Sequence, residues 1–279
     1  MALNPLSPAR QIVFHQMLVA FRKTILMDAL SDALAQVDPK IIKKQLLKYV
    51  PADAQRILAA SGVRDEHVFP VPAILEQRPN LVGYYRLLLG VSQKRFYRSG
   101  TGMSPYRSME VRGILNIKRP PDLHSFCSVM AGNLAELVRS ASPSITAREV
   151  SELPLLTLGG QLYGSDNNAI GKQVTREVFG AVADVVSQFT TSQSGSKIIL
   201  RNASKRKVII TLGADPDIRL QEEFEGTFRN IVAVEIKGGA DMSNVHNRVG
   251  EAEKSHRKAK KQDFRDCWTM IPLTGLDRA

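Results

Sequence analysis

The most informative segment of the chain is NIVAVEIKGG at residues 230–239. Four β-branched residues within it favour extended backbone and predict a largely buried strand. These residues are Ile231, Val232, Val234 and Ile236. Side chains two residues apart in a strand point to the same side, so Glu235 and Lys237 are expected to emerge together where the strand ends. The pattern therefore places a carboxylate beside an ammonium group, next to a glycine pair.

A second acidic residue lies upstream, in the stretch GADPDIRL at residues 213–220. Asp217 follows a proline there, and seventeen residues separate it from Glu235. That separation is enough for one strand, a turn and a return strand, so a hairpin can bring the two carboxylates together. Asp215 lies two residues earlier and could share the same face of the strand, so it is an alternative for this second acid. We favour Asp217 because it directly follows Pro216.

The residue types in this cluster suit the hydrolysis of a phosphodiester. Two carboxylates that converge on one point can bind Mg²⁺, which prefers few carboxylates and keeps several waters. Such a metal polarises a phosphoryl oxygen and lowers the pKa of a bound water. Lys237 can orient that water and offset the charge that develops on phosphorus. The alternative for Glu235 and Lys237 is a solvated strand end without chemistry.

The surrounding elements predict an α/β (α+β) fold, with a helical N-terminal region followed by a mixed central sheet flanked by helices. Helices are expected at 8–37, 38–50, 52–60, 80–98 (two short ones, broken near Gly90), 122–141, 168–189 and 243–262, with Asp38 and Asp122 as caps. Strands are expected at 197–201, 207–212, 217–224, 231–237 and 266–273. The prolines and glycine pair of residues 142–165 predict irregular structure.

The composition indicates a polyanionic partner. The 279 residues contain 38 Lys and Arg against 27 Asp and Glu, a net charge of +11, of which residues 1–119 carry +10. Nucleic acid and anionic membrane surfaces both attract such a charge. No apolar run reaches the ~18 residues of a membrane span, and two distant cysteines exclude a disulfide scaffold. We expect an intracellular protein without a signal peptide.

The candidates for DNA contact lie in two segments. Residues 86–119 hold eight basic residues and one acid near four tyrosines, which suits a surface that follows phosphates, although the tyrosines could equally be core residues. The candidates in this segment are Lys94, Arg95, Arg98, Arg107 and Arg112. The helix after Lys237 adds Asn244, His246 and Arg248, which suit base edges or phosphates. Its later lysines suit phosphates or the helix C-terminus.

The spacing P-D-x17-E-x-K resembles the signature of the PD-(D/E)XK nuclease superfamily. Three segments in addition resemble type II restriction endonucleases of the XcyI type, over roughly residues 80–270. These segments are LVGYYRLLLGVSQKRFY (81–97), TLGGQLYGSDNNAIG (157–171) and VEIKGGADMSNVHNRVGEAEKSH (234–256). The resemblance implies that Asp217 and Glu235 bind metal and that Lys237 is the catalytic lysine. Glu177, in the helix before the sheet, is a further candidate metal ligand or else an exposed helical glutamate.

The resemblance also implies a function and its partners. It implies a Mg²⁺-dependent endonuclease that cuts double-stranded DNA within a short palindrome, possibly CCCGGG, in the bacterial cytoplasm alongside a cognate DNA methyltransferase. Because a two-fold dimer cuts both strands of a palindrome most simply, we expect a homodimer. Residues 1–120 would then form a DNA-binding and dimerisation region, and residues 121–279 the endonuclease core, with its catalytic segment at 166–273. The rivals are a structure-specific repair or recombination nuclease and a non-catalytic DNA-binding protein.

Overall fold

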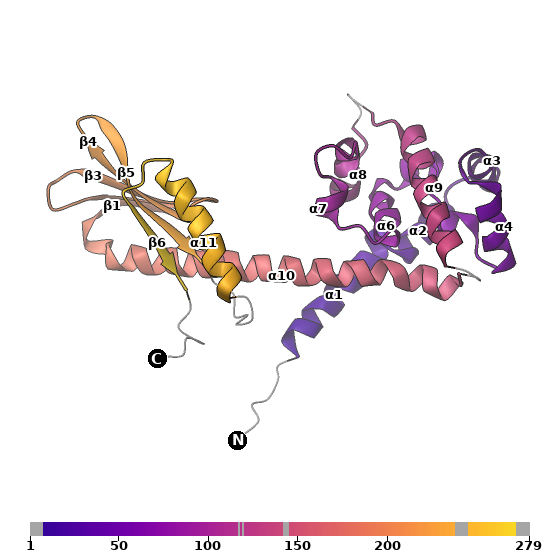
Figure 1. The fold of residues 1–279 in the computed structure, drawn as a ribbon, viewed down its shortest axis with the longest axis horizontal. Helices are drawn as coiled ribbons and strands as arrows, with labels where there is room; N and C mark the ends of the chain where they lie inside the picture. The colour runs from indigo at the N-terminus through magenta and orange to yellow at the C-terminus, as the bar shows by residue number, and fades with distance from the viewer. Residues whose placement is uncertain (1–7, 117, 119, 142–144, 238–244, 272–279) are drawn as a thin grey trace, which may run out of the picture. The chain divides into compact units, whose positions relative to one another are not determined.

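The computed structural model describes residues 8–116, 118, 120–141, 145–237 and 245–271 (Figure 1). The chain divides into two compact units, Met1–Tyr163 and Gly164–Ala279. This division falls later than the expected boundary at 120/121. The reason is helix α9 (Leu123–Ser140), which buries Phe126, Met130 and Leu134 in the core of the first unit.

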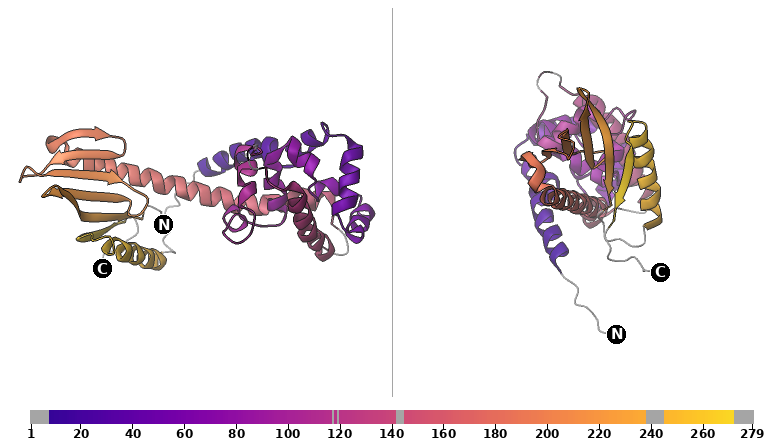
Figure 2. Two further views of the ribbon diagram at one scale, coloured as in Figure 1. Left: turned by 90° about the horizontal axis from the view of Figure 1, so that it is seen from above. Right: turned by 90° about the vertical axis from the view of Figure 1, so that its left-hand side faces the viewer.

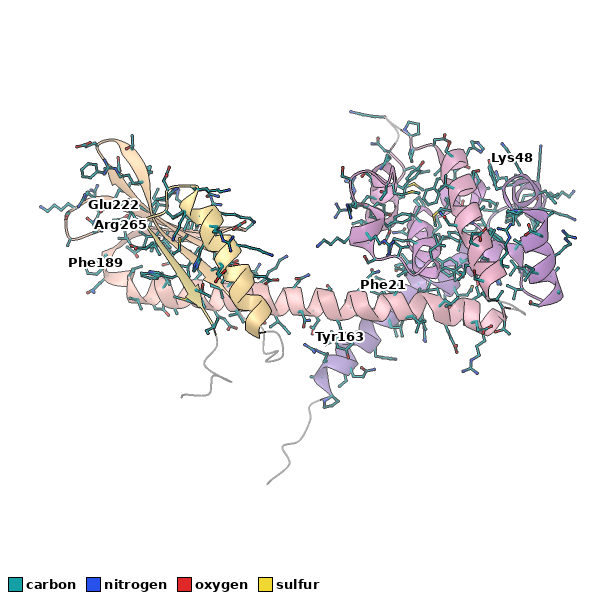
Figure 3. All side chains as sticks on the ribbon, in the orientation of Figure 1. Phe21, Lys48, Tyr163, Phe189, Glu222 and Arg265 are labelled. Carbon is teal, nitrogen blue, oxygen red and sulfur yellow. The ribbon has the colours of Figure 1, made fainter. Side chains whose placement is uncertain are left out.

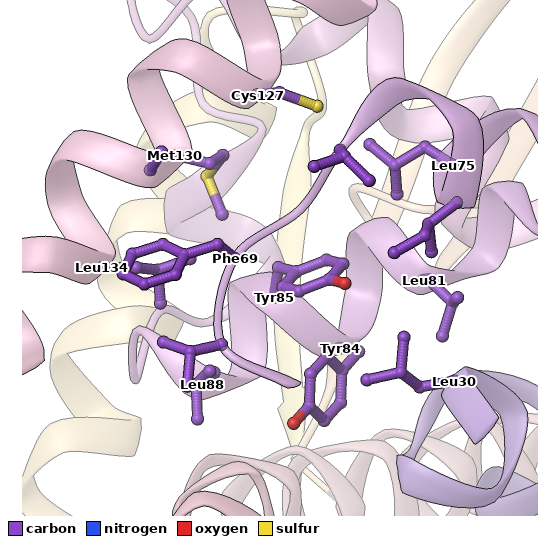
Figure 4. Close-up of a cluster of buried hydrophobic side chains, with 14 of the residues drawn as sticks. Leu30, Phe69, Leu75, Leu81, Tyr84, Tyr85, Leu88, Cys127, Met130 and Leu134 are labelled. Carbon is purple, nitrogen blue, oxygen red and sulfur yellow. The ribbon is translucent and has the colours of Figure 1, made fainter. Parts of the chain in front are cut away.

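The first unit is helical. Its helices are α1 (Ala9–Ile25), α2 (Met27–Leu34), α3 (Pro39–Tyr49), α4 (Ala52–Ala60), α5 (Pro72–Gln77), α6 (Val82–Leu88), α7 (Gln93–Phe96), α8 (Arg107–Arg112), α9 and the first part of α10 (Ala147–Val185), with single turns η1 (Asp65–His67), η2 (Pro79–Leu81) and η3 (Ser104–Tyr106). Figure 4 shows part of its core, where Tyr84 and Tyr85 gather with leucines and Met130. The alternative that places these tyrosines in the core is therefore confirmed.

Two predicted helix caps are confirmed. The side chain of Asp38 accepts a hydrogen bond from the backbone N–H of Lys40 at the start of α3. The side chain of Asp122 accepts from the backbone N–H groups of His124 and Ser125 at the start of α9. These bonds satisfy N–H groups that have no partner within the helix, so both helices begin where the sequence predicts.

The helix expected over 8–37 is instead two helices, α1 and α2, which are separated at Leu26. Leu26 is extended and buried. The break allows the two helices to join different apolar clusters. Ile25 packs with Leu158 and Leu162 of α10, whereas Leu30 of α2 enters the main core.

The prediction of irregular structure over 142–165 is wrong for residues 147–165, which belong to α10. The side chains of Thr146 and Glu149 cap this helix reciprocally, since each accepts a hydrogen bond from the backbone N–H of the other. Val150, Leu158 and Leu162 are buried along it. Tertiary packing therefore outweighs the unfavourable helix propensities of Pro154 and the glycine pair.

The second unit contains one mixed sheet. Its strands β1 (Thr190–Ser194), β2 (Lys197–Arg201), β3 (Lys207–Leu212), β4 (Ile218–Phe224), β5 (Thr227–Ile236) and β6 (Asp266–Met270) lie in the order β1-β2-β3-β4-β5-β6. Neighbours are antiparallel except β5 and β6, which are parallel and joined through α11 (Val245–Lys260). The single turn η4 (Ser187–Phe189) precedes β1. The predicted mixed sheet is confirmed, with the polar edge strand β1 added.

Two helices cover opposite faces of this sheet, as the right-hand view of Figure 2 shows. The α10 face carries Ile218, Val232 and Val234, which pack with Phe179 and Ala183 of α10. The α11 face carries Ala233 and Cys267, which pack with Ala259 of α11 and with Phe264. Because strand side chains alternate, Glu235 and Lys237 project from the α11 face.

Candidate active site

Strand pairing brings Asp217 opposite Glu235. Ile218 at the start of β4 is the register partner of Val234 in β5. Because the strands are antiparallel, Asp217, which precedes Ile218, lies opposite Glu235, which follows Val234. The carboxylate Oδ2 of Asp217 accepts a hydrogen bond of 2.7 Å from the backbone N–H of Ile236. The two predicted carboxylates therefore share the end of one antiparallel pair.

The loop before β4 is held in a tight conformation. The backbone N–H of Gly213 donates to the carbonyl oxygen of Asp217 at 2.8 Å. A Cβ atom on Gly213 would lie 2.6 Å from the carbonyl oxygen of Pro216, so the close approach requires glycine. Arg219 also donates to the carbonyl oxygen of Asp215 at 2.7 Å. These bonds fix the backbone on which Asp217 is presented.

Lys237 forms ion pairs with two carboxylates. Its Nζ lies 2.8 Å from Oε1 of Glu235 and 3.5 Å from Oε2 of Glu251 in α11. The side chains of Glu235 and Lys237 are only 12% and 18% exposed. Burial alone would lower the pKa of Lys237, but the hydrogen bond and charge of Glu235, with Glu251, outweigh it and raise the pKa. Lys237 is thus a cation, and a hydrogen-bond donor, at neutral pH.

Asp217 lies in an environment that disfavours its charge. Partial burial raises the pKa of its carboxyl group, the hydrogen bond from Ile236 lowers it, and the nearby charge of Glu235 raises it again. Two carboxylates that repel each other across paired strands suit a divalent cation. Within the described residues no group of three or more His, Cys, Asp or Glu side chains could hold a metal ion. The two carboxylates fit a Mg²⁺ ion that keeps several waters, as this ion usually does.

Asp215 and Asp217 have different partners. Oδ2 of Asp215 lies 2.8 Å from Nζ of Lys258 in α11, whereas Asp217 is bonded to the backbone of β5. The Asp215 side chain is 42% exposed. The acid that lies opposite Glu235 is therefore Asp217.

The structure does not bring Glu177 into this group. Glu177 is exposed on α10, where its carboxylate accepts a hydrogen bond from the side chain of Gln173 at 2.8 Å. The apolar side of α10 packs on the face of the sheet opposite to that of Glu235. The described contacts give Glu177 no link to the other two acids.

The predicted DNA-contact residues of the first unit are exposed. Lys94 and Arg95 lie in α7, Arg98 follows this helix, and Arg107 and Arg112 lie in α8. Among the residues described, none of them forms an ion pair with an acid. Figure 3 draws the described side chains of both units as sticks.

The remaining candidates lie near the start of α11. Asn244 lies outside the described residues, as does the glycine pair Gly238 and Gly239. His246 and Arg248 lie in the first turn of α11, and their side chains also lie outside the described part. These three side chains therefore remain predictions.

Sequence reasoning missed a buried ion pair in the basic segment. Arg86 and Glu110 are 1% and 5% exposed, with Nη2 and Oε1 at 2.8 Å. Glu110 also accepts hydrogen bonds from Gln93 and Tyr97. The sequence feature that could have indicated this pair is Glu110, the only acid in the basic segment 86–119. Arg86 therefore serves the core of the first unit, and the positive surface consists of its exposed neighbours.

The family is shown by comparison with known proteins. A model described as the XcyI restriction endonuclease matches residues 15–279. The chain belongs to the XcyI restriction endonuclease family. It is 40% identical over 274 residues to the type II restriction enzyme XcyI of Xanthomonas campestris pv. cyanopsidis, an alignment that covers 97% of this chain and 82% of that protein. Identity to the type II restriction enzyme Cfr9I of Citrobacter freundii is 38% over 274 residues, with 97% and 83% covered.

Two further findings accompany this family membership. No solved structure matches the chain. Among the helices that the structure describes, none is long and apolar enough to cross a membrane. The fold and candidate site of this family member therefore rest on its own sequence and geometry.

Proposed function

We propose that the protein is a Mg²⁺-dependent type II restriction endonuclease that hydrolyses phosphodiester bonds in double-stranded DNA. One observation carries the proposal. In a chain of the XcyI restriction endonuclease family, Asp217 at the start of β4 faces Glu235 near the end of β5, and Lys237 shares their face. Family membership supports the reaction class, and the geometry supports the choice of Asp217, Glu235 and Lys237.

Asp217 and Glu235 would hold the metal. Glu235 lies on β5 and Asp217 directly precedes its paired strand β4, and both are partly buried, so the sheet restricts where their carboxylates can lie. When bound, Mg²⁺ would polarise a phosphoryl oxygen and provide a water of lowered pKa. Neutralising the mutual repulsion of the two acids would favour binding.

Lys237 would act on the phosphate and the attacking water. Its ammonium group remains protonated because Glu235 and Glu251 stabilise the charge. Such a group can donate a hydrogen bond that orients the water, and its charge offsets the negative charge that develops on the phosphoryl oxygens. Its hydrogen bond to Glu235 keeps the ammonium group beside the metal ligands.

The substrate and the assembly follow from the type II class. We infer a short palindromic target, with CCCGGG as the first candidate, read by arginines that can pair with guanine edges. A homodimer would place one active site on each strand. The enzyme would act in the bacterial cytoplasm, where a cognate DNA methyltransferase protects the host target.

Digestion of a plasmid of known sequence tests the proposal. With Mg²⁺ we expect discrete fragments whose ends map to one palindrome, and with EDTA we expect no cleavage. A smear, cleavage at flaps or junctions only, or no cleavage under any metal condition would contradict the proposal. Sedimentation in the presence of a duplex with a single target tests the homodimer.

A further inference from the structure

Two contacts fix which side of α11 faces the candidate active site. Glu251 lies 3.5 Å from Nζ of Lys237, and Lys258 lies 2.8 Å from Oδ2 of Asp215. These two α11 residues are seven positions apart, or about two turns, and so lie on one side of the helix. Ala252 and Ala259 are buried a quarter of a turn away, where α11 packs on the sheet. The rotation of the helix about its axis is therefore determined.

Two more lysines lie near this side of the helix, Lys254 within α11 and Lys261 directly after its last residue, Lys260. Lys254 lies three residues after Glu251, and Lys261 lies three residues after Lys258. Both lysines therefore lie next to these two residues, on the side away from Ala252 and Ala259. Both are exposed, and the side chain of Lys258 is 64% exposed. We name the row formed by Lys254, Lys258 and Lys261 the lysine ridge. Over the described residues, Lys254 and Lys261 pair with no carboxylate.

The opposite flank of α11 carries Lys260, which is exposed and lies about half a turn from Glu251. Arg257 lies between Lys260 and the ridge and is paired with Glu253 at 3.4 Å. Of the three exposed lysines in this part of the chain without a described carboxylate partner, Lys254 and Lys261 lie toward the side that carries the contacts to Lys237 and Asp215, and Lys260 does not.

We propose that the lysine ridge binds backbone phosphates of the DNA strand next to the scissile phosphate, and that Asp215 holds Lys258 only until a phosphate replaces it. This inference rests on the proposed function, because it takes double-stranded DNA as the substrate. The ridge continues the positive charge of Lys237 along a helix rise of about 10 Å. Successive phosphates of one DNA strand are spaced ~3.4 Å along the duplex axis, so the ridge can reach a short run of them.

The chemistry of Lys258 suits an exchange of partners. The hydrogen bond and charge of Asp215 raise the pKa of Lys258, so the ammonium group is charged at neutral pH. Its pairing with Asp215 lies at a largely exposed position, where an ion pair is worth little. A DNA phosphate could therefore replace Asp215 at small cost.

The salt dependence of DNA binding tests the ridge. Fluorescence anisotropy in EDTA would use one duplex with CCCGGG and one scrambled duplex, so that no cleavage interferes. We expect Lys254→Ala and Lys261→Ala each to reduce the slope of log affinity against log salt by about 0.9, on both duplexes. The matched control Lys260→Ala should leave the slope unchanged. Unchanged slopes for the two ridge variants, or an equal decrease for Lys260→Ala, would overturn the proposal.

A second pair of variants tests the exchange at Asp215. Asp215→Asn frees Lys258, so it should tighten DNA binding, whereas Lys258→Ala should weaken it and reduce the slope. A purely structural bridge predicts that both variants weaken binding equally, which would contradict the exchange. These measurements do not depend on cleavage. If the slopes change as expected while the wild type cuts no DNA, the ridge is supported and the proposed function fails.

Discussion

The carboxylate of Asp217 accepts a hydrogen bond of 2.7 Å from the backbone N–H of Ile236. This bond ties the acid at the start of β4 to the strand that carries Glu235 and Lys237. The partner is a backbone group of a paired strand, so its position is set by the sheet. The pairing of β4 with β5 therefore fixes the position of Asp217 relative to Glu235 and Lys237.

Asp217→Asn and Asp215→Asn should differ sharply in cleavage. Asparagine keeps an oxygen that can accept the bond from Ile236 but removes the charge that a metal ligand needs. We expect single-turnover cleavage to fall by about 10²- to 10³-fold in Asp217→Asn. Asp215→Asn should lose far less, because Asp215 pairs with Lys258. A larger loss in Asp215→Asn would show that the metal ligand is misassigned.

The raised pKa of Asp217 predicts a pH-dependent effect on stability. The folded protein keeps this proton at pH values where the unfolded chain, with an ordinary pKa of 3.8, has released it. The stabilisation is therefore complete below that value and is lost as the pH rises through the raised pKa. In EDTA, Asp217→Asn should raise Tm relative to wild type more at pH 7 than at pH 4. Equal Tm differences at both pH values would count against this account.

Gly213→Ala tests the tight loop before β4. The added Cβ atom would meet the carbonyl oxygen of Pro216 at 2.6 Å, so the loop must shift. We expect a loss of about 1–3 kcal/mol in urea unfolding, together with slower cleavage. Gly195→Ala is the matched control in the same unit, because nothing lies within 4 Å of its added Cβ. Gly213→Ala should unfold at a lower urea concentration than Gly195→Ala, and equal midpoints would contradict this expectation.

The buried ion pair of the first unit should be sensitive to removal of one partner. Arg86→Met leaves Glu110 buried without its cation, which should lower the free energy of unfolding by about 3–5 kcal/mol. Arg148→Met breaks a pair to Glu152 whose side chains are 85% and 52% exposed, and should cost at most about 1 kcal/mol. Denaturant titration compares the two. Equal losses would mean that Arg86 does not stabilise the core.

Local patterns predicted much of the second unit. The alternation of Val234, Glu235, Ile236 and Lys237 is a property of one strand, so the faces of β5 could be assigned from neighbouring residues. The hairpin that brings Asp217 to Glu235 follows from their separation along the chain. Each of these inferences needs only contacts that are short-range or set by one turn.

Features that depend on tertiary packing could not be predicted. The glycines and Pro154 disfavour a helix over 147–165, yet burial of Leu158 and Leu162 against α1 and its neighbours keeps α10 continuous. The contact between Lys258 and Asp215 joins residues far apart in sequence, with no periodic signal. For the burial of Arg86, the lone acid Glu110 in the basic segment is the one local signal, because a buried arginine and a DNA-contacting arginine otherwise have the same local pattern.

The most direct test of the account is the cleavage rate of Glu235→Gln on a plasmid with one CCCGGG site and Mg²⁺. The variant keeps the size of the side chain but removes one charge of the metal pair. We expect cleavage to fall by about 10²- to 10³-fold while duplex binding in EDTA persists. Glu253→Gln, on the far flank of α11, should cut as wild type does. Undiminished cleavage by Glu235→Gln would contradict the assignment of Asp217, Glu235 and Lys237 as the active site.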